Sequence, residues 1–193
     1  MLLQRLVQVV LRPRQTLAEA AQAPAQPAEL VIQIALLALI PTFCGYLATA
    51  VVGWDLGVGT PFKLPLLTAG YVAVAAYVAF NVGVYGMGFA IYWLAQTFSV
   101  RPDPLKCLEL AVLTSLPLFL SGFMALYPLL YVDITVGMFA VAASLYLLYT
   151  GVPIFMEIPQ EAGFIYSTWI AALGLIMLVA FIGVSVFIFT GLT

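Results

Sequence analysis

Five long apolar segments dominate this chain, and almost every charged residue lies in the gaps between them. As a helix, each segment is long enough to cross the hydrocarbon core of a bilayer, which takes about 20 residues. Charged residues make up only 7% of the chain, whereas a water-soluble protein has roughly 25%. Inside a bilayer the backbone N–H and C=O groups must form hydrogen bonds within the protein, so only helices and closed β-barrels can cross it. A barrel strand needs only about 10 residues, so segments of this length indicate helices. The sequence therefore predicts an all-α polytopic membrane protein with five transmembrane helices.

We expect a single transmembrane domain over residues 1–193, because no connecting segment is long enough to fold alone. Residues 1–28 are predicted to be a cytoplasmic N-terminal segment, whose first apolar residues recur at helical spacing and make it amphipathic. Pro13 suits the first turn of a short helix within this segment. The five predicted spans cover residues 30–52, 64–94, 105–130, 134–154 and 164–192.

The lysines and arginines of the short connections predict the orientation, because cytoplasmic loops carry an excess of both. If the N-terminus is cytoplasmic, the outer face holds Lys63 alone. The inner face then holds Arg5, Arg12, Arg14, Arg101 and Lys106. We therefore expect the N-terminus in the cytoplasm and the C-terminus outside. Residues 53–63 and 131–133 are predicted outside, and residues 95–104 and 155–163 inside. So few basic residues, without a cluster, argue against nucleic acid as a partner.

Ionisable side chains are costly inside a bilayer, so those near the spans are candidates for a functional site. Four carboxylates lie at the predicted cytoplasmic face, together with Arg101 and Lys106. They are Asp103, Glu109, Glu157 and Glu161. One hypothesis is that they bind a hard cation or relay protons, and the other is that they form ion pairs. No metal-binding spacing is present, which favours ion pairs, and Lys106 lies one helical turn before Glu109.

Two further features concern the second predicted span. Asn81 is the only amide deep inside a span, so it should face protein, either as a bond between helices or as part of a polar pathway. Ala75, Ala79 and Gly83 are four residues apart and predict a ridge of small residues for close helix contact, within the chain or between copies.

Catalytic motifs are missing from the sequence, which also contains no histidine. No serine or cysteine has an evident base beside it, and no glycine-rich phosphate loop is present outside an apolar span. These absences favour a non-enzymatic protein and imply no cofactor.

Three short segments resemble a known family. Residues 9–17, in which Pro13 precedes a short helix, are similar to its cytoplasmic entry. Residues 111–118, small and polar up to Pro117, are similar to its third span, and residues 146–161 resemble its most recognisable stretch. The family is the Yip family, the Ypt/Rab-interacting-protein superfamily of five-span membrane proteins, and the chain resembles most closely its bacterial inner-membrane branch.

This resemblance implies a five-span bundle with a cytoplasmic N-terminus and an external C-terminus. Eukaryotic relatives are associated with small GTPases, but this chain lacks their long soluble N-terminal region, which argues against GTPase binding. We therefore expect a membrane-organising or partner-binding protein that contacts the lipid bilayer and a second copy or another membrane protein. The alternative is a small transporter or ion-conducting protein that uses the cytoplasmic-face carboxylates and Asn81. A membrane-embedded enzyme ranks third.

Overall fold

The computed structural model describes residues 12–54, 63–97, 100–127 and 129–192, the last eight of them as backbone only. Five of its helices are long and apolar enough to cross a membrane, and the described part of the chain contains no strand. The helices are α2 (Pro13–Gln22), α3 (Pro27–Leu47), α4 (Leu66–Thr97), α5 (Pro104–Ser121), α6 (Leu130–Met156) and α7 (Gln160–Leu192). These findings confirm the predicted all-α fold with five spans. The amphipathic start of the chain lies outside the described residues.

Proline sets the start of three helices. Pro13, Pro27 and Pro104 each occupy the first turn of α2, α3 and α5, where the missing N–H group has no intrahelical partner to lose. The side chain of Asp103 caps α5, because its carboxylate accepts a hydrogen bond of 3.0 Å from the backbone N–H of Leu105. The expected short helix after Pro13 is therefore present.

The third and fourth spans differ from their predicted bounds. The α-helical part of α5 ends at Ser121, and a 3₁₀ turn over Gly122–Leu126 follows. The next helix begins at Leu130, four residues before the predicted start of the fourth span. Apolar residues continue through this turn, so hydropathy alone gives no sign of it. As a result Asp133, predicted to lie in an outer loop, is part of α6.

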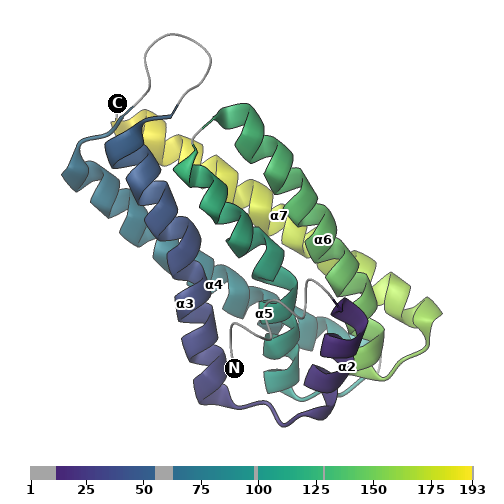
Figure 1. The fold of residues 1–193 in the computed structure, drawn as a ribbon. Coiled ribbons are helices and arrows are strands. Elements are labelled where there is room, and N and C mark those ends of the chain that lie inside the picture. Colours follow the sequence, from purple (N-terminus) through teal and green to yellow (C-terminus); the bar gives the residue numbers. More distant parts are fainter. Residues whose placement is uncertain (1–11, 55–62, 98–99, 128, 193) are drawn as a thin grey trace.

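Helix α5 is the central helix of the bundle (Figure 1). Half of its span is buried by the rest of the chain, compared with 11% in α4 and in α7. Its buried side chains include Leu110 and Leu116, which belong to one continuous hydrophobic core. The close approach of α4 depends on Gly88, because a Cβ atom there would lie 3.0 Å from the Cα atom of Leu108. The peripheral helices α4 and α7 leave most of their apolar surface for lipid or a partner.

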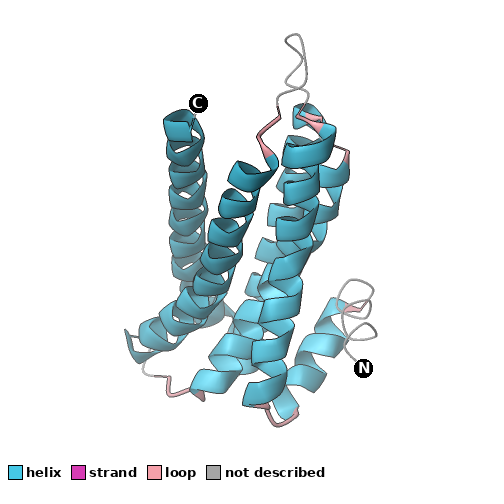
Figure 2. Ribbon diagram, turned by 90° about the vertical axis from the view of Figure 1, so that its left-hand side faces the viewer, coloured by secondary structure: helices cyan, strands magenta, loops and turns pink. Residues whose placement is uncertain are grey.

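The connections separate into two ends of the bundle (Figures 1 and 2). The helix α2 and the connections at residues 100–103 and 157–159 lie at one end, here called the α2 end. The end of α7 and the end of α3 lie at the other, here called the C-terminal end. The described parts of the segments predicted to be cytoplasmic are therefore at the α2 end.

Candidate functional site

Lys106 is the centre of the polar contacts at the α2 end. Its Nζ atom is 2.8 Å from Oε2 of Glu109, which forms the ion pair expected from their spacing. The same ammonium donates hydrogen bonds to the backbone carbonyls of Ala20, at 2.5 Å, and of Ala23. It also lies 5.9 Å from the centre of the Phe155 ring, within range of a cation–π interaction. One side chain of α5 thus contacts α2, α6 and its own helix.

These contacts explain how α2 is held against the bundle. The last carbonyls of a helix lack intrahelical partners and carry partial negative charge, and α2 has no basic residue in its last turn. Lys106 supplies that positive charge from another helix. The apolar side of α2 is equally engaged, because Leu17 is fully buried. Gly151 on α6 leaves the room for it, since a Cβ atom there would lie 3.4 Å from Leu17 and 2.7 Å from Leu110. The helix α2 is therefore a packed part of the domain.

The four candidate carboxylates are not gathered into a cation site. Asp103 caps α5, Glu109 pairs with Lys106, and Glu161 lies exposed in the first turn of α7, where the helix dipole favours it. Glu157 ends α6 in a left-handed conformation with φ of 51°. Among the described residues, no three Asp, Glu, His or Cys side chains are close enough to hold a metal ion. The shared cation site stays a prediction: the described residues form no such group, and Asp103 and Glu109 are already engaged at their own helix.

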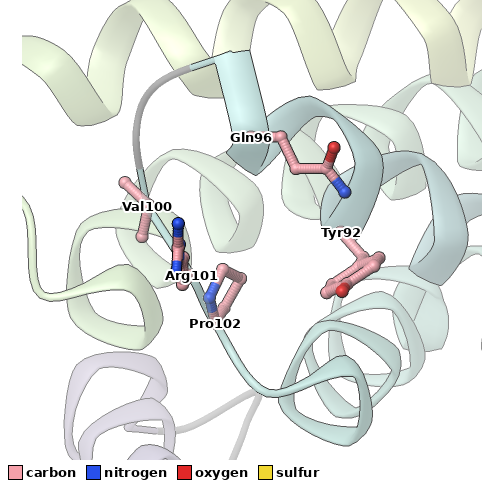
Figure 3. A pocket seen from close by; sticks show the side chains of 5 residues that line it. All are labelled: Tyr92, Gln96, Val100, Arg101 and Pro102. Carbon is pink, nitrogen blue, oxygen red and sulfur yellow. The ribbon is translucent and has the colours of Figure 1, made fainter.

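Arg101 lies beside a polar pocket of about 590 Å³ at the same end. Figure 3 shows Tyr92 and Gln96, one turn apart on α4, on one side and the segment Val100, Arg101 and Pro102 on the other. Within the described ranges, the Lys106–Glu109 pair is the only salt bridge, so Arg101 has no carboxylate partner there. The expected role of Arg101 in an ion pair is therefore not seen, because Asp103, the nearest acid in sequence, is turned to its own helix end.

The side chain of Asn81, the second predicted feature, forms its hydrogen bond within its own helix. Its Nδ2 atom donates a 2.8 Å hydrogen bond to the carbonyl of Tyr77. The neighbouring helix contact is made instead by Tyr77, whose hydroxyl donates to the carbonyl of Ala35 on α3 at 3.4 Å. In this structure Asn81 does not link two helices.

Among the described residues, no helix packs closely on the small-residue ridge of α4 at Gly83. Ala75 is exposed, and a Cβ atom added at Gly83 would meet nothing within 4 Å. The close helix contact of α4 is instead made at Gly88, as described above. Association between copies through the ridge stays a prediction.

Ala79 and Gly83 line a second cavity, of about 530 Å³, whose walls come mainly from α4, α5, α6 and α7. Most of its lining is apolar, and Asp133 is the only ionisable group among the described residues that line it. Sequence reasoning missed Asp133, because a charge beside an apolar segment normally marks the end of a span. The spacing between Asp133 and Ser144 could have indicated its position. Eleven residues are about three helical turns, so the two side chains lie on the same face of a helix.

The fold and these sites define a polytopic α-helical membrane protein with a packed N-terminal helix. The family model described as the Yip1 domain matches residues 7–182, and the chain belongs to that family. It is similar to "Inner membrane protein YohC" of Escherichia coli (strain K12), with 37% identity over 153 residues, which are 79% of this chain and 78% of that protein. The protein of the same name from Escherichia coli O6:H1 matches with the same identity and coverage. No solved structure matches the chain. The resemblance to the Yip family is confirmed.

Proposed function

We propose that this protein is a non-enzymatic membrane-organising protein of a bacterial inner membrane, and that it holds the headgroup of an anionic lipid at its α2 end. The observation that carries the proposal is the pocket of Tyr92, Gln96 and Arg101, in which an exposed arginine lacks an acidic partner among the described residues. Two relatives named "Inner membrane protein YohC" support the proposed location.

The orientation puts this pocket at the cytoplasmic surface. The α2 end carries Arg12, Arg14, Arg101 and Lys106, whereas Lys63 lies at the other end, so the charge rule assigns the α2 end to the cytoplasm. Anionic lipids give the cytoplasmic leaflet its negative surface potential. Beside the pocket, Trp93 is 57% exposed, as expected for an aromatic side chain at the membrane interface.

The side chains of the pocket suit a phosphate group. A guanidinium group binds phosphate through two parallel hydrogen bonds, and an amide N–H and a phenol hydroxyl supply further donors. Gln96 and Tyr92 carry these groups, and neither side chain has a hydrogen-bond partner in the described part of the chain. The nearest acids do not compete, because Asp103 caps α5 and Glu109 is paired with Lys106.

The alternative of a small transporter that uses the cytoplasmic-face carboxylates has less support. Its candidate carboxylates, Asp103, Glu109, Glu157 and Glu161, form no group able to hold a metal ion among the described residues, and Asp103 and Glu109 are engaged at their own helix. The amide of Asn81 bonds to its own helix and does not line either cavity described above. The membrane-organising function is therefore the one that we carry forward.

The test is lipid retention by the purified protein. Native mass spectrometry would count bound phosphatidylglycerol and phosphatidylcholine on the wild type and on Arg101→Gln. We expect preferential retention of phosphatidylglycerol by the wild type and a loss of about fivefold in Arg101→Gln, because one arginine at an anionic surface contributes about 1 kcal/mol. Arg14→Gln is the matched control, since Arg14 is an exposed arginine at the same end but outside the pocket. Equal retention by Arg101→Gln and Arg14→Gln would refute the proposed lipid site.

A further inference from the structure

The apolar cavity between α4 and α7 contains two buried oxygen atoms that lack a partner. Oδ2 of Asp133 and Oγ of Ser144 are both inaccessible to solvent, and neither has a hydrogen bond among the described residues. Both residues line the cavity from α6. A buried polar atom without a partner costs about 1–3 kcal/mol, and more when it is charged, so such atoms require an explanation.

Among the described residues, no neighbouring group satisfies these oxygens. The one indole of the described lining, that of Trp54, donates its N–H to Oγ1 of Thr49 at 3.2 Å. The described lining contains no lysine, arginine or histidine. Asp133 as a whole is only partly buried and lines the cavity, so a ligand there can approach its carboxylate from the open side. Such a ligand must bring hydrogen-bond donors, and beside a lone carboxylate it gains most by being a cation.

The shape of the cavity fits a small amphiphile better than a helix. Its volume of about 530 Å³ lies within the roughly 300–1,000 Å³ of ligand pockets, which are mostly apolar with a few polar groups. Four helices of the same chain contribute to its walls, so it is a space within the bundle and not a flat face. Figure 2 shows α7 standing apart from the other helices towards the C-terminal end, which is the end where α6 begins and Asp133 lies.

Within the cavity, the polar atoms are spaced along the helix axis. Eleven residues of α6 separate Asp133 from Ser144, a rise of about 16 Å. Asp133 lies near the end of the bundle, where a headgroup would be, and Ser144 lies deeper among apolar side chains such as Leu148. A molecule with one polar head and an aliphatic body matches this arrangement.

We propose that this cavity binds a single-chain amphiphile with an ammonium head, whose head pairs with the Asp133 carboxylate and whose aliphatic body fills the space beside Ser144. Phospholipid heads fit less well, because their phosphate would approach Asp133 without any cation of the chain to offset the repulsion. This site is separate from the headgroup pocket at the α2 end, so either proposal stands or fails without the other.

The experiment uses the full chain in nanodiscs of phosphatidylcholine, with dodecylammonium as the probe. Thermal unfolding is followed against probe concentration, and a ligand that binds the folded state raises Tm in a saturable manner. We expect dodecylammonium to bind about tenfold more tightly than 1-dodecanol, because a charge-assisted hydrogen bond replaces a neutral one. Asp133→Asn should remove this difference while leaving the binding of 1-dodecanol unchanged, which also shows that the variant is folded.

Two matched controls separate this site from adsorption to the lipid. Glu161→Gln removes an exposed carboxylate at the α2 end and should leave both apparent Kd values unchanged. Gly83→Leu fills the cavity and should weaken both ligands, whereas Gly70→Leu, on the same helix but outside the cavity, should weaken neither. The proposal is overturned if dodecylammonium binds no more tightly than 1-dodecanol, or if Asp133→Asn binds it as the wild type does.

Discussion

Replacing Lys106 by methionine tests whether one ammonium group holds α2 against the bundle. Methionine keeps an unbranched side chain of similar length, so the apolar packing beside Phe155 is largely preserved. The ammonium is lost, and with it the 2.8 Å ion pair with Glu109 and the hydrogen bonds to the carbonyls of Ala20 and Ala23. We expect a large loss of unfolding free energy and local opening of α2.

The expected magnitude follows from burial. Glu109 is only 8% exposed, so Lys106→Met leaves a buried carboxylate without a counter-charge. Removing one partner of a buried pair costs about 3–5 kcal/mol. The two lost carbonyl bonds add about 1 kcal/mol each, because the Lys106 side chain is only 16% exposed and water replaces them in part. Glu109→Gln should cost less, about 1–2 kcal/mol, because Lys106 keeps its bonds to α2.

The double variant Lys106→Met/Glu109→Met distinguishes a paired charge from simple packing. It also removes the Glu109 carboxylate that Lys106→Met leaves buried without a counter-charge, so it should be more stable than Lys106→Met alone. The interaction free energy between the two sites in the double-mutant cycle should be about 2 kcal/mol. Unfolding would be followed by titration with sodium dodecyl sulfate in mixed micelles, and hydrogen exchange would report on α2. Lys63→Met is the control, because Lys63 is exposed and donates to the carbonyl of Val51 without a carboxylate. This reasoning would be refuted if Lys106→Met lost less than about 1 kcal/mol of unfolding free energy. It would also be refuted if the losses of the two single variants added up to the loss of the double variant.

Two other predictions concern packing and topology. Gly88→Ala should cost about 1–3 kcal/mol, because its Cβ would lie 2.9 Å from Cδ1 and 3.0 Å from Cα of Leu108. Gly83→Ala meets open space and should be neutral or slightly stabilising in the same unfolding titration; equal losses would contradict the packing described for α4. In a variant without native cysteines, a cysteine at Lys63 should react with an impermeant thiol reagent added outside, and one at Gln160 should not. The reverse pattern would invert the proposed orientation.

Features that depend on neighbouring residues of one segment were predictable from the sequence. The five spans follow from the length of the apolar segments, and α5 begins one residue before the predicted start of the third span. The pairing of Lys106 with Glu109 follows from one helical turn of spacing. The bounds of the third and fourth spans were less accurate, because the 3₁₀ turn at Gly122–Leu126 is as apolar as the helices around it.

Features that depend on contacts between distant segments were not predictable in this way. Lys106 is separated from the carbonyl of Ala20 by 86 residues, and only the folded chain brings them together. The ridge that contains Gly83 has the spacing of a helix contact, but the packing of α4 passes through Gly88. A repeat of small residues marks where helices are able to approach, and the shapes of the facing side chains decide where they do.

Asp133 shows why hydropathy undervalues polar residues near the ends of a span. A charge next to an apolar segment is assigned to the loop, since the sequence does not say whether the helix continues past it. Here α6 begins at Leu130, so Asp133 faces the bundle, while Arg101 at the opposite end lies in a connection. These residues have opposite charge, and neither has an ion pair among the described residues. Asp103 and Glu109 are engaged at their own helix, so both proposed binding sites use instead Arg101 and Asp133, for which the described residues offer no ion pair.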